Sequence, residues 1–324
     1  MRRRLDVRRL TQYGVVVVVA VTLNFLLPRL MPGNPLVLIA GVDVGLLSPD
    51  ERAEIVARVG LDAPLWKQYL RYWGDILTGD FGYSFRSSRP IVDMILDRLP
   101  WTLLITGLSL IVSAVAGVIL GAISAWRRGT KADLGMLSGM ISIESLPSFW
   151  LGMLLISIFA VQWGVLPSSH AVTPASGLVG WAHTWDIISH AILPVVTLSI
   201  LATPGVYMTM RYSMLETLGE DYIRTARAKG AGERRVLFGH VARNTIAPVV
   251  TVLALRLGFA FGGTVIVETV FTYPGLGRLV FEAVSGRDYP VMQAAFLVFT
   301  AAVLACNLLA DLLYPLIDPR TRTP

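Results

Sequence analysis

The stretch that decides the fold is "EDYIRTARAKGAGERRVLFGHVARNTIAP", residues 220–248, which lies between two of the most apolar segments of the chain. Six of its 29 residues are Lys or Arg. Glu220 and Asp221 suit the N-terminus of a helix, where the helix dipole favours acidic side chains. We expect a first helix through "DYIRTARAK" that stops at the "GAG" of residues 230–232, and a second through "ERRVLFGHVARN" that ends before Pro248.

Two interpretations of this basic segment follow from its residues. In the first, the two helices form an amphipathic hairpin that lies on anionic lipid. In the second, the segment is a docking element, because Ala and Gly at the turn allow the cleft of another protein to approach the backbone. The residues alone leave both interpretations open.

The composition of the chain indicates an integral membrane protein. Its 324 residues are 54% hydrophobic and only 15% charged, whereas a soluble domain carries about 25% charged residues. The net charge of +6 comes from basic residues scattered among apolar stretches, so we expect no nucleic-acid partner. Cys306 is the only cysteine, which excludes an intrachain disulfide.

No set of residues in the sequence carries a recognisable chemistry. The chain has no GxxxxGK[ST] phosphate loop, so we do not expect it to bind ATP itself. Its four histidines do not occur at the spacing of known metal sites, and no nucleophile is paired with a base. We therefore expect no enzyme activity, no metal site and no cofactor in this chain.

Six stretches are long enough to cross a bilayer at about 20 residues each. They cover residues 10–27, 101–125, 134–160, 188–210, 249–267 and 291–317. The first follows "MRRRLDVRRL" and mimics a signal peptide, but no small-x-small cleavage site precedes Pro28, so we expect an uncleaved span. An all-α membrane protein with six spans is the predicted fold.

The distribution of basic residues predicts the orientation in the membrane. The N-terminal tail holds five Arg, "WRRGTKAD" at residues 126–133 holds three Lys or Arg, and residues 220–248 are basic as well. The loop at residues 161–187 has no Lys or Arg. The positive-inside rule therefore places both termini in the cytoplasm.

Residues 28–100 form a long segment that we expect on the outer side of the membrane. "SPDERAEIVARVG", residues 48–60, has the capping residues of a helix that starts at Ser48 and stops at Gly60. "APLWKQYLRYWGDIL", residues 63–77, carries Trp and Tyr at helical spacing. This second helix either lies on the outer membrane surface or packs against the spans.

A few ionisable residues fall inside or at the edges of the predicted spans, where a charge needs a partner or water. They are Glu144, Arg256, Glu268 and Asp311. Glu144 and Arg256 either pair between helices or line a substrate path. Pro147, in "SIESLPSFWLG", removes a backbone hydrogen bond and predicts a kink in the third span.

Several of these stretches resemble the permeases of bacterial ABC importers, in the form typical of oligopeptide and dipeptide importers. The resemblance rests on "DYIRTARAKGAGERRVLFGHVARNTIAPVVT", "ETVFTYPGLGRLVFEAVSGRDYPVMQ", "GLDAPLWKQYLRYWGDILTGDFGYSF" and "LPSFWLG". The general importer motif has Glu-Ala-Ala, then Gly, then Ile-x-Leu-Pro. Here Arg224-Thr225-Ala226 and Gly230 are in register, but residues 240–243 do not match, a departure that the peptide-importer branch shares.

The resemblance implies a type I importer permease, the first of a pair, at the bacterial inner membrane. Its partners would be a second homologous permease, two cytoplasmic ATP-binding subunits, an extracytoplasmic substrate-binding protein and membrane lipid. The basic segment would be the coupling helix, seated in a groove of an ATPase. The contact residues implied by this resemblance are Ala226, Arg227, Lys229, Gly230, Ala231 and Glu233.

We therefore divide the chain into four parts. Residues 1–27 form the basic tail and first span, and residues 28–100 form the extracytoplasmic helical segment. Residues 101–317 form a five-span core with the coupling loop at residues 211–248, and residues 318–324 form a cytoplasmic tail. Import of short peptides is the predicted function; import of nickel or another small solute, and stand-alone secondary transport, are the alternatives.

Overall fold

The computed structural model describes residues 7–30, 48–50 and 62–317. In these ranges the regular elements are helices, and the only β-type pairing is an isolated bridge between Tyr83 and Pro90. The described residues therefore agree with the predicted all-α class. The helix predicted for residues 48–60 lies outside the described residues, except for its first three positions.

The chain divides into two compact units. The first contains residues 1–100 and 274–304, and the second contains residues 101–273 and 305–324. The sequence did not predict that residues 274–304 pack with the N-terminal part, because they follow the fifth predicted span directly. The helices of the first unit are α1 (Val7–Leu30), α4 (Leu65–Thr78), the start of α5 (Ile91–Trp126), α12 (Leu276–Ser285) and most of α13 (Tyr289–Ile317).

Helix α4 confirms the helix predicted over residues 63–77, and it packs against α1 through aromatic rings. The ring of Phe25 lies 5.2 Å from the ring of Tyr69 and 5.7 Å from that of Tyr72. The Tyr72 hydroxyl accepts a hydrogen bond from the Asn24 amide, at 3.0 Å. Trp66 and Leu77 on the same helix remain exposed, so packing accounts for only part of the predicted aromatic stripe.

The core of the first unit joins the start of α5 to α12 and α13. Ile91 and Leu276 are completely buried, and Val291 is nearly so. The carboxylate of Asp288 accepts hydrogen bonds from the Ser84 hydroxyl and from the backbone N–H groups of Phe85 and Arg86. These contacts hold residues 274–304 to the N-terminal part of the chain.

The second unit is a bundle centred on one long helix. Its elements are the rest of α5, α6 (Lys131–Glu144), α7 (Ser148–Leu155), η2 (Ile156–Gln162), α8 (Trp181–Gly219), α9 (Asp221–Ala228), α10 (Glu233–Arg235), η3 (Val236–Val241), α11 (Ala242–Val270) and the end of α13. Helix α8 packs against α6, α7 and α11. A Cβ on Gly121 would lie 2.7 Å from the Tyr207 carbonyl oxygen, so glycine lets α5 approach α8 closely.

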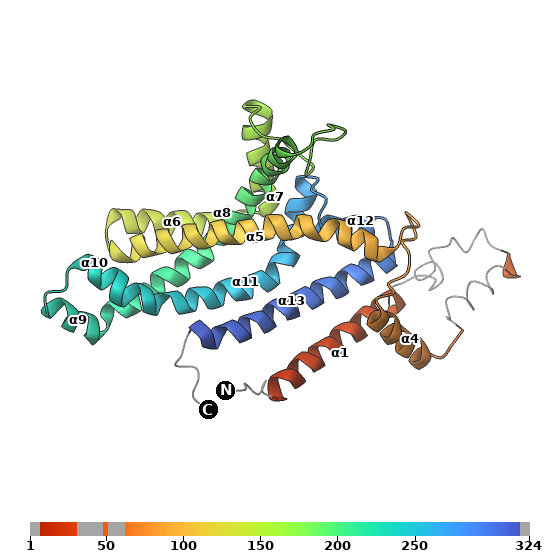
Figure 1. The fold of residues 1–324 in the computed structure, drawn as a ribbon, viewed down its shortest axis with the longest axis horizontal. Coiled ribbons are helices and arrows are strands. Elements are labelled where there is room, and N and C mark those ends of the chain that lie inside the picture. The colour runs from red at the N-terminus through yellow and green to blue at the C-terminus, as the bar shows by residue number, and fades with distance from the viewer. Residues whose placement is uncertain (1–6, 31–47, 51–61, 318–324) are drawn as a thin grey trace. The chain divides into compact units, whose positions relative to one another are not determined.

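Among the described residues, three helices are long and apolar enough to cross a membrane: α5, α8 and the Tyr289–Leu308 part of α13; the bent pair of α6 with α7 and η2 is a fourth candidate if it forms one span. The third predicted span, residues 134–160, is divided into α6 and α7, which meet at an angle of 102° and run in clearly different directions in Figure 1. Pro147 is the extended residue just before α7, with φ −64° and ψ 136°. The predicted kink is therefore a complete break, because the chain leaves the helical conformation at the proline.

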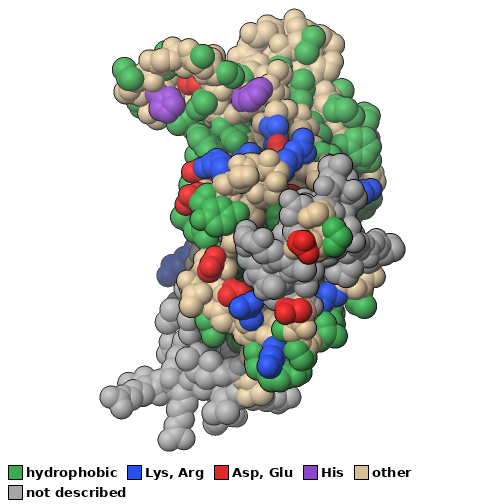
Figure 2. Space-filling model, turned by 90° about the vertical axis from the view of Figure 1, so that its right-hand side faces the viewer, with side chains coloured by type: hydrophobic (Ala, Val, Ile, Leu, Met, Phe, Trp, Pro, Cys, Tyr) green, Lys and Arg blue, Asp and Glu red, His purple; other side chains and the backbone are tan. Residues whose placement is uncertain are grey.

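Much of the described surface is apolar. Large hydrophobic side chains are exposed on α1, α5, α6 and α7, among them Val15, Ile111, Leu134 and Trp150. Figure 2 shows hydrophobic side chains reaching the surface on the face that it draws. A surface of this kind suits contact with lipid.

Candidate functional site

The basic segment of residues 220–248 begins with a short helix after α8. Helix α9 runs from Asp221 to Ala228, with an acidic side chain in its first turn and Arg227 in its last. Both charges have the sign that the helix dipole favours at their ends. The backbone N–H of Ile223 donates to the Glu220 carbonyl at 3.1 Å, so one of the free donors of the helix start is satisfied.

Helix α9 ends in a glycine cap of the Schellman type. The N–H of Gly230 donates to the Arg227 carbonyl at 2.9 Å, and the N–H of Ala231 donates to the Ala226 carbonyl at 3.1 Å. Gly230 has φ +81°, a left-handed conformation that glycine adopts at little cost. The predicted stop at residues 230–232 is therefore confirmed, and its cause is the backbone conformation of Gly230.

An apolar inner side anchors this turn to the bundle. Ile223 from α9 and Val236 from η3 are completely buried in a cluster with Met210 and Met214 of α8. Burying a side chain of this size contributes about 1.5–3 kcal/mol. The turn is thus held on the end of α8 rather than extended into solvent. We call residues 221–241 the α9–η3 hairpin.

The outer side of the α9–η3 hairpin carries most of the predicted contact residues. Arg227, Lys229, Gly230 and Glu233 are exposed, whereas Ala226 and Ala231 are half-buried. Arg227 donates to the carboxylate of Glu233 across the turn, at 3.3 Å. Because both side chains are largely exposed, this ion pair contributes at most about 1 kcal/mol.

Models of two protein families match the chain over most of its length. Residues 117–323 match the model described as binding-protein-dependent transport system inner membrane component. Residues 1–106 match the model of the N-terminal part of such membrane components. The chain belongs to this family. It is therefore a multi-pass membrane component of a transport system, as the sequence predicted.

Curated relatives of this membrane component carry names from peptide transport. The chain is 37% identical over 317 residues to the dipeptide transport system permease protein DppB of Escherichia coli, with 93% of each chain covered. It is 36% identical to the oligopeptide transport system permease protein AppB of Bacillus subtilis, with 96% of this chain and 97% of AppB covered. It is 40% identical to the glutathione transport system permease protein GsiC of Salmonella paratyphi A, with 97% of each covered.

One solved structure supports the fold of this membrane component. A crystal structure described as an amino acid ABC transporter with histidines matches with a TM-score of 0.53 and 16% sequence identity. The match covers 69% of this chain and 94% of that one. At this level of identity the likeness concerns the fold alone.

The second arm of the α9–η3 hairpin differs from the sequence prediction. The second helix was expected to end before Pro248, but α10, η3 and α11 follow one another without a break, and Pro248 lies inside α11. Val241 and Val249, on either side of the proline, are almost completely buried against α8. Their burial, at about 1.5–3 kcal/mol each, offsets the roughly 3 kcal/mol that a proline costs inside a helix.

A buried polar network next to the hairpin was missed by sequence reasoning. The guanidinium of Arg211 on α8 donates twice to the carboxylate of Asp133 on α6, at 2.9 and 3.1 Å. The hydroxyl of Ser124 on α5 donates a hydrogen bond to the carboxylate of Asp133 and shares another with the hydroxyl of Tyr207. Asp133 also accepts the N–H of Gly129, at 3.0 Å. We call Ser124, Asp133, Tyr207 and Arg211 the α5–α6–α8 network.

This network ties three helices together at the end of α8 that carries the hairpin. The Asp133 side chain is 2% exposed and that of Arg211 is 11% exposed, so both charges are removed from water. The pair is close to the bidentate geometry that favours Arg with a carboxylate. Sequence spacing could not reveal it, because the two residues are 78 positions apart; the only local signal was Asp133 in the first turn of α6.

The ionisable residues predicted within the spans are not brought together as expected. Arg256 on α11 donates to the Ala202 carbonyl of α8 at 3.1 Å, and it fills the space beside Gly205, where a Cβ would overlap its guanidinium. Glu144 is exposed at the end of α6. Among the described residues, no ion pair joins Glu144 to Arg256, and the alternative of a substrate path stays a prediction.

Glu268 on α11 has a partner that the sequence could not identify. It is completely buried, and its carboxyl group accepts a hydrogen bond from the Thr102 hydroxyl of α5 at 2.8 Å. This contact connects two helices of the second unit. In the part of the chain that the structure describes, no group of three or more His, Cys, Asp or Glu is arranged to hold a metal ion.

Proposed function

We propose that this chain is one of two permease subunits of an ATP-driven importer for short peptides. The proposal is supported by its family membership together with the names of its relatives, which refer to dipeptide, oligopeptide and glutathione transport. These names favour peptides over nickel as the substrate. The single observation that carries the proposal is the agreement of relatives at 36–40% identity over nearly the whole chain.

The partners of the chain follow from this proposal. A binding protein on the outer side delivers the peptide, a second homologous permease completes the translocation path, and two cytoplasmic subunits hydrolyse ATP. The chain lies in the bacterial inner membrane with both termini in the cytoplasm, as its basic loops favour. The peptide crosses between the two permeases, and no group in this chain has to carry out chemistry on it.

The α9–η3 hairpin is the proposed coupling element to one ATPase. Its inner side is anchored on α8 by Ile223 and Val236, and its outer side presents Arg227, Lys229 and Gly230 to a partner. Space beside Gly230 is open, since nothing in the described chain lies within 4 Å of a Cβ placed there. When ATP closes the two ATPases, movement of the groove is transmitted through the hairpin to α8 and α11.

The α5–α6–α8 network gives the proposed coupling a physical basis. The hairpin transmits movement only if the part of the chain that carries it is rigid, and that part is the end of α8. The buried pair of Asp133 and Arg211 fixes that end to α5 and α6. A push on the hairpin therefore moves these helices together instead of bending α8 alone.

Reconstitution of the importer tests the proposed function. The tagged chain is co-expressed with the second permease and ATPases of its own transport system, purified as a complex and placed in liposomes with the matching binding protein. We expect uptake of labelled dipeptide and tripeptide that requires ATP on the side of the membrane where the ATPases lie. This uptake is expected to stop when a catalytic residue of the ATPases is replaced. Peptide uptake driven by a proton gradient without ATP would overturn the proposal.

A further inference from the structure

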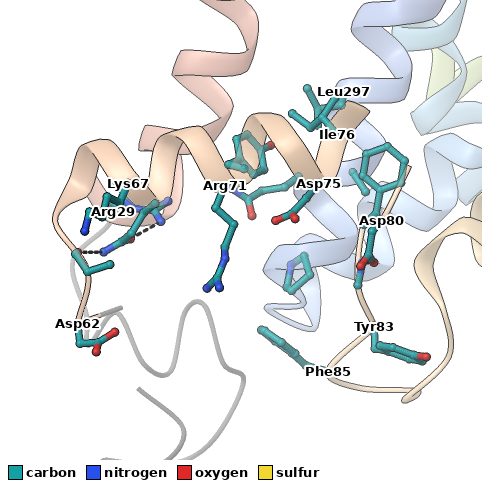
Figure 3. A pocket seen from close by; sticks show the side chains of 18 residues that line it. Arg29, Asp62, Lys67, Arg71, Asp75, Ile76, Asp80, Tyr83, Phe85 and Leu297 are labelled. Carbon is teal, nitrogen blue, oxygen red and sulfur yellow. Dashed lines mark hydrogen bonds between the residues drawn. The ribbon is translucent and has the colours of Figure 1, made fainter. Parts of the chain in front are cut away.

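The first unit contains a cavity that the proposed coupling role does not use. Its volume is about 620 Å³, which is within the range of small-molecule sites, about 300–1,000 Å³. Figure 3 shows that α4 provides one wall, and that the loop after α4 and the start of α13 contribute to the others. All of these elements belong to the same unit.

Cationic side chains from α1 and α4 line one end of the cavity, and two acidic side chains lie at the other end. Arg29, Lys67 and Arg71 are on the cationic part, with Asp62 below them, whereas Asp75 and Asp80 lie together at the other end (Figure 3). Aromatic and apolar side chains line the space between and beside them. These are Tyr72, Ile76, Phe81, Tyr83, Phe85 and Leu297.

Arg71 is the cation best placed to meet a ligand. Figure 3 shows its side chain pointing into the cavity. By contrast, Arg29 is already engaged, since it donates to the Phe25 carbonyl at 2.7 Å and to the Gln68 side chain at 2.8 Å. Within the described ranges, no hydrogen bond holds the guanidinium of Arg71. A planar guanidinium of this kind suits a carboxylate ligand.

The acidic end is suited to a positive group. Burial raises the pKa of Asp75, the nearby carboxylate of Asp80 raises it further, and Arg71 lowers it. The negative charge of Asp80 therefore opposes ionisation of Asp75. An ammonium group bound between them would remove this repulsion, because it attracts both negative charges.

The spacing of the charges fits a short peptide. Arg71 and Asp75 are four residues apart along α4, and Lys67 and Asp75 are eight apart, which corresponds to about 6 and 12 Å of helix rise. An extended peptide spans about 3.3–3.6 Å per residue. Two to four residues therefore cover the distance between a carboxylate at Arg71 or Lys67 and an amine at Asp75.

We propose that this cavity binds a zwitterionic short peptide, with the C-terminal carboxylate at Arg71 and the N-terminal ammonium between Asp75 and Asp80. The inference rests on the proposed function and adds a peptide site on the permease itself, formed mostly by the segment between the first two predicted spans and completed by the start of the sixth. The same pair of charges occurs in a phosphatidylethanolamine headgroup. In that lipid phosphate and ammonium are separated by only a two-carbon link, so a headgroup cannot cover the roughly 12 Å from Lys67 to Asp75 but comes near the roughly 6 Å from Arg71 to Asp75.

Peptide binding to the full chain alone tests the inference. The chain is placed in nanodiscs of phosphatidylcholine, without binding protein or ATPases, and radiolabelled trialanine is added in equilibrium dialysis. We expect saturable binding that N-acetylation or C-terminal amidation of the peptide each weakens about tenfold, the loss of one charge-assisted contact. Equal binding of the blocked and free peptides, or no saturable binding, would overturn the inference.

Variants assign the binding to the cavity. Arg71→Ala and Asp75→Asn are expected to weaken trialanine binding about tenfold each. Arg89→Ala and Asp97→Asn are matched controls, because this exposed ion pair of the same unit lies outside the cavity. Binding that Arg71→Ala and Asp75→Asn leave unchanged, or that the control variants weaken as much, contradicts the assignment.

Lipid composition separates the two sources of the zwitterion. Nanodiscs in which half of the phosphatidylcholine is replaced by phosphatidylethanolamine are expected to bind trialanine with the same affinity. Loss of trialanine binding in these nanodiscs means that the headgroup competes for the cavity, and a peptide site in membranes that contain phosphatidylethanolamine is refuted. ATP-driven uptake in the complete importer is measured separately, so a failure of this inference leaves the proposed function standing.

Discussion

The buried pair of Asp133 and Arg211 provides the sharpest prediction for stability. Replacing Asp133 by Asn keeps the shape of the side chain but leaves the Arg211 guanidinium charged, with its side chain only 11% exposed. Breaking a buried pair in this way costs about 3–5 kcal/mol. At roughly 2–4 °C per kcal/mol for a chain of this size class, the melting temperature falls by on the order of 10 °C.

An exposed ion pair of the same length serves as the control. Arg89 and Asp97 are also 2.9 Å apart, but their side chains are 56% and 60% exposed. Asp97→Asn is therefore expected to cost less than about 1 kcal/mol, and the difference between the two variants isolates burial from distance. The double variant Asp133→Asn with Arg211→Gln removes the stranded charge and is expected to melt above Asp133→Asn alone.

The measurement is thermal unfolding of the purified chain in one detergent, followed by loss of the monodisperse peak in size-exclusion chromatography. All four proteins are compared at the same pH and lipid content. Equal melting temperatures for Asp133→Asn and Asp97→Asn would refute the reasoning, because burial would then add nothing to the pair. A double variant that melts below Asp133→Asn would also contradict it.

Three further predictions concern glycines and the cavity. Gly230→Leu is expected to abolish the coupling of peptide uptake to ATP hydrolysis, with the protein still in the membrane; normal uptake in this variant argues against the coupling role. Two controls separate backbone strain from side-chain bulk, because asparagine in Gly230→Asn tolerates a positive φ and Gly232, replaced in Gly232→Leu, has φ −63°. Gly121→Ala is expected to lower stability by about 1–3 kcal/mol, because the added Cβ meets the Tyr207 backbone. Gly135→Ala, whose added Cβ has nothing within 4 Å, is expected to leave stability unchanged or raise it by up to about 1 kcal/mol. Equal melting temperatures of the two variants contradict this prediction. Since the pKa of Asp75 is raised in the folded chain, the folded state binds more protons than the unfolded state, and stability falls as pH rises through that pKa. The melting temperature of the wild type relative to Asp75→Asn is therefore expected to rise as pH is lowered from about 7 to about 4. A difference between the two proteins that does not change with pH contradicts this prediction.

Local sequence patterns were sufficient to predict two features of the fold, the end of α9 and the helix α4. The stop after α9 was predicted from Gly230, and the structure explains it by a positive φ and two capping hydrogen bonds. Helix α4 was predicted from aromatic residues at helical spacing and is observed over Leu65–Thr78. In both cases the signal lies within a few residues of the feature that it predicts.

Tertiary packing decided the features that sequence reasoning missed. Pro248 predicts a helix end by local rules, but burial of Val241 and Val249 continues the helix through it. Pro147, by contrast, interrupts its helix and turns the chain by 102°. The sequence does not distinguish the two prolines, because the difference lies in which neighbouring helix covers the residues on either side.

Pairing over long sequence distances was equally hidden. The partner of Arg211 is 78 residues away, and the partner of Glu268 is 166 residues away. One of the two alternatives for Arg256 paired it with another charge, Glu144, but the guanidinium instead donates to the Ala202 carbonyl. Every residue has a backbone carbonyl, so a search of the sequence for opposite charges cannot identify it as a partner. This contact could be found only in the folded chain.

Photo-crosslinking from the hairpin tests the central claim most directly. A photoreactive amino acid is placed at Lys229, which is exposed on the outer side of the hairpin, and in a control protein at Leu77, which is 80% exposed on α4. In cells that express the whole importer, we predict an adduct between position 229 and an ATP-binding subunit, and none from position 77. Adducts of position 229 with lipid alone would contradict the account and favour a hairpin that lies on the membrane surface.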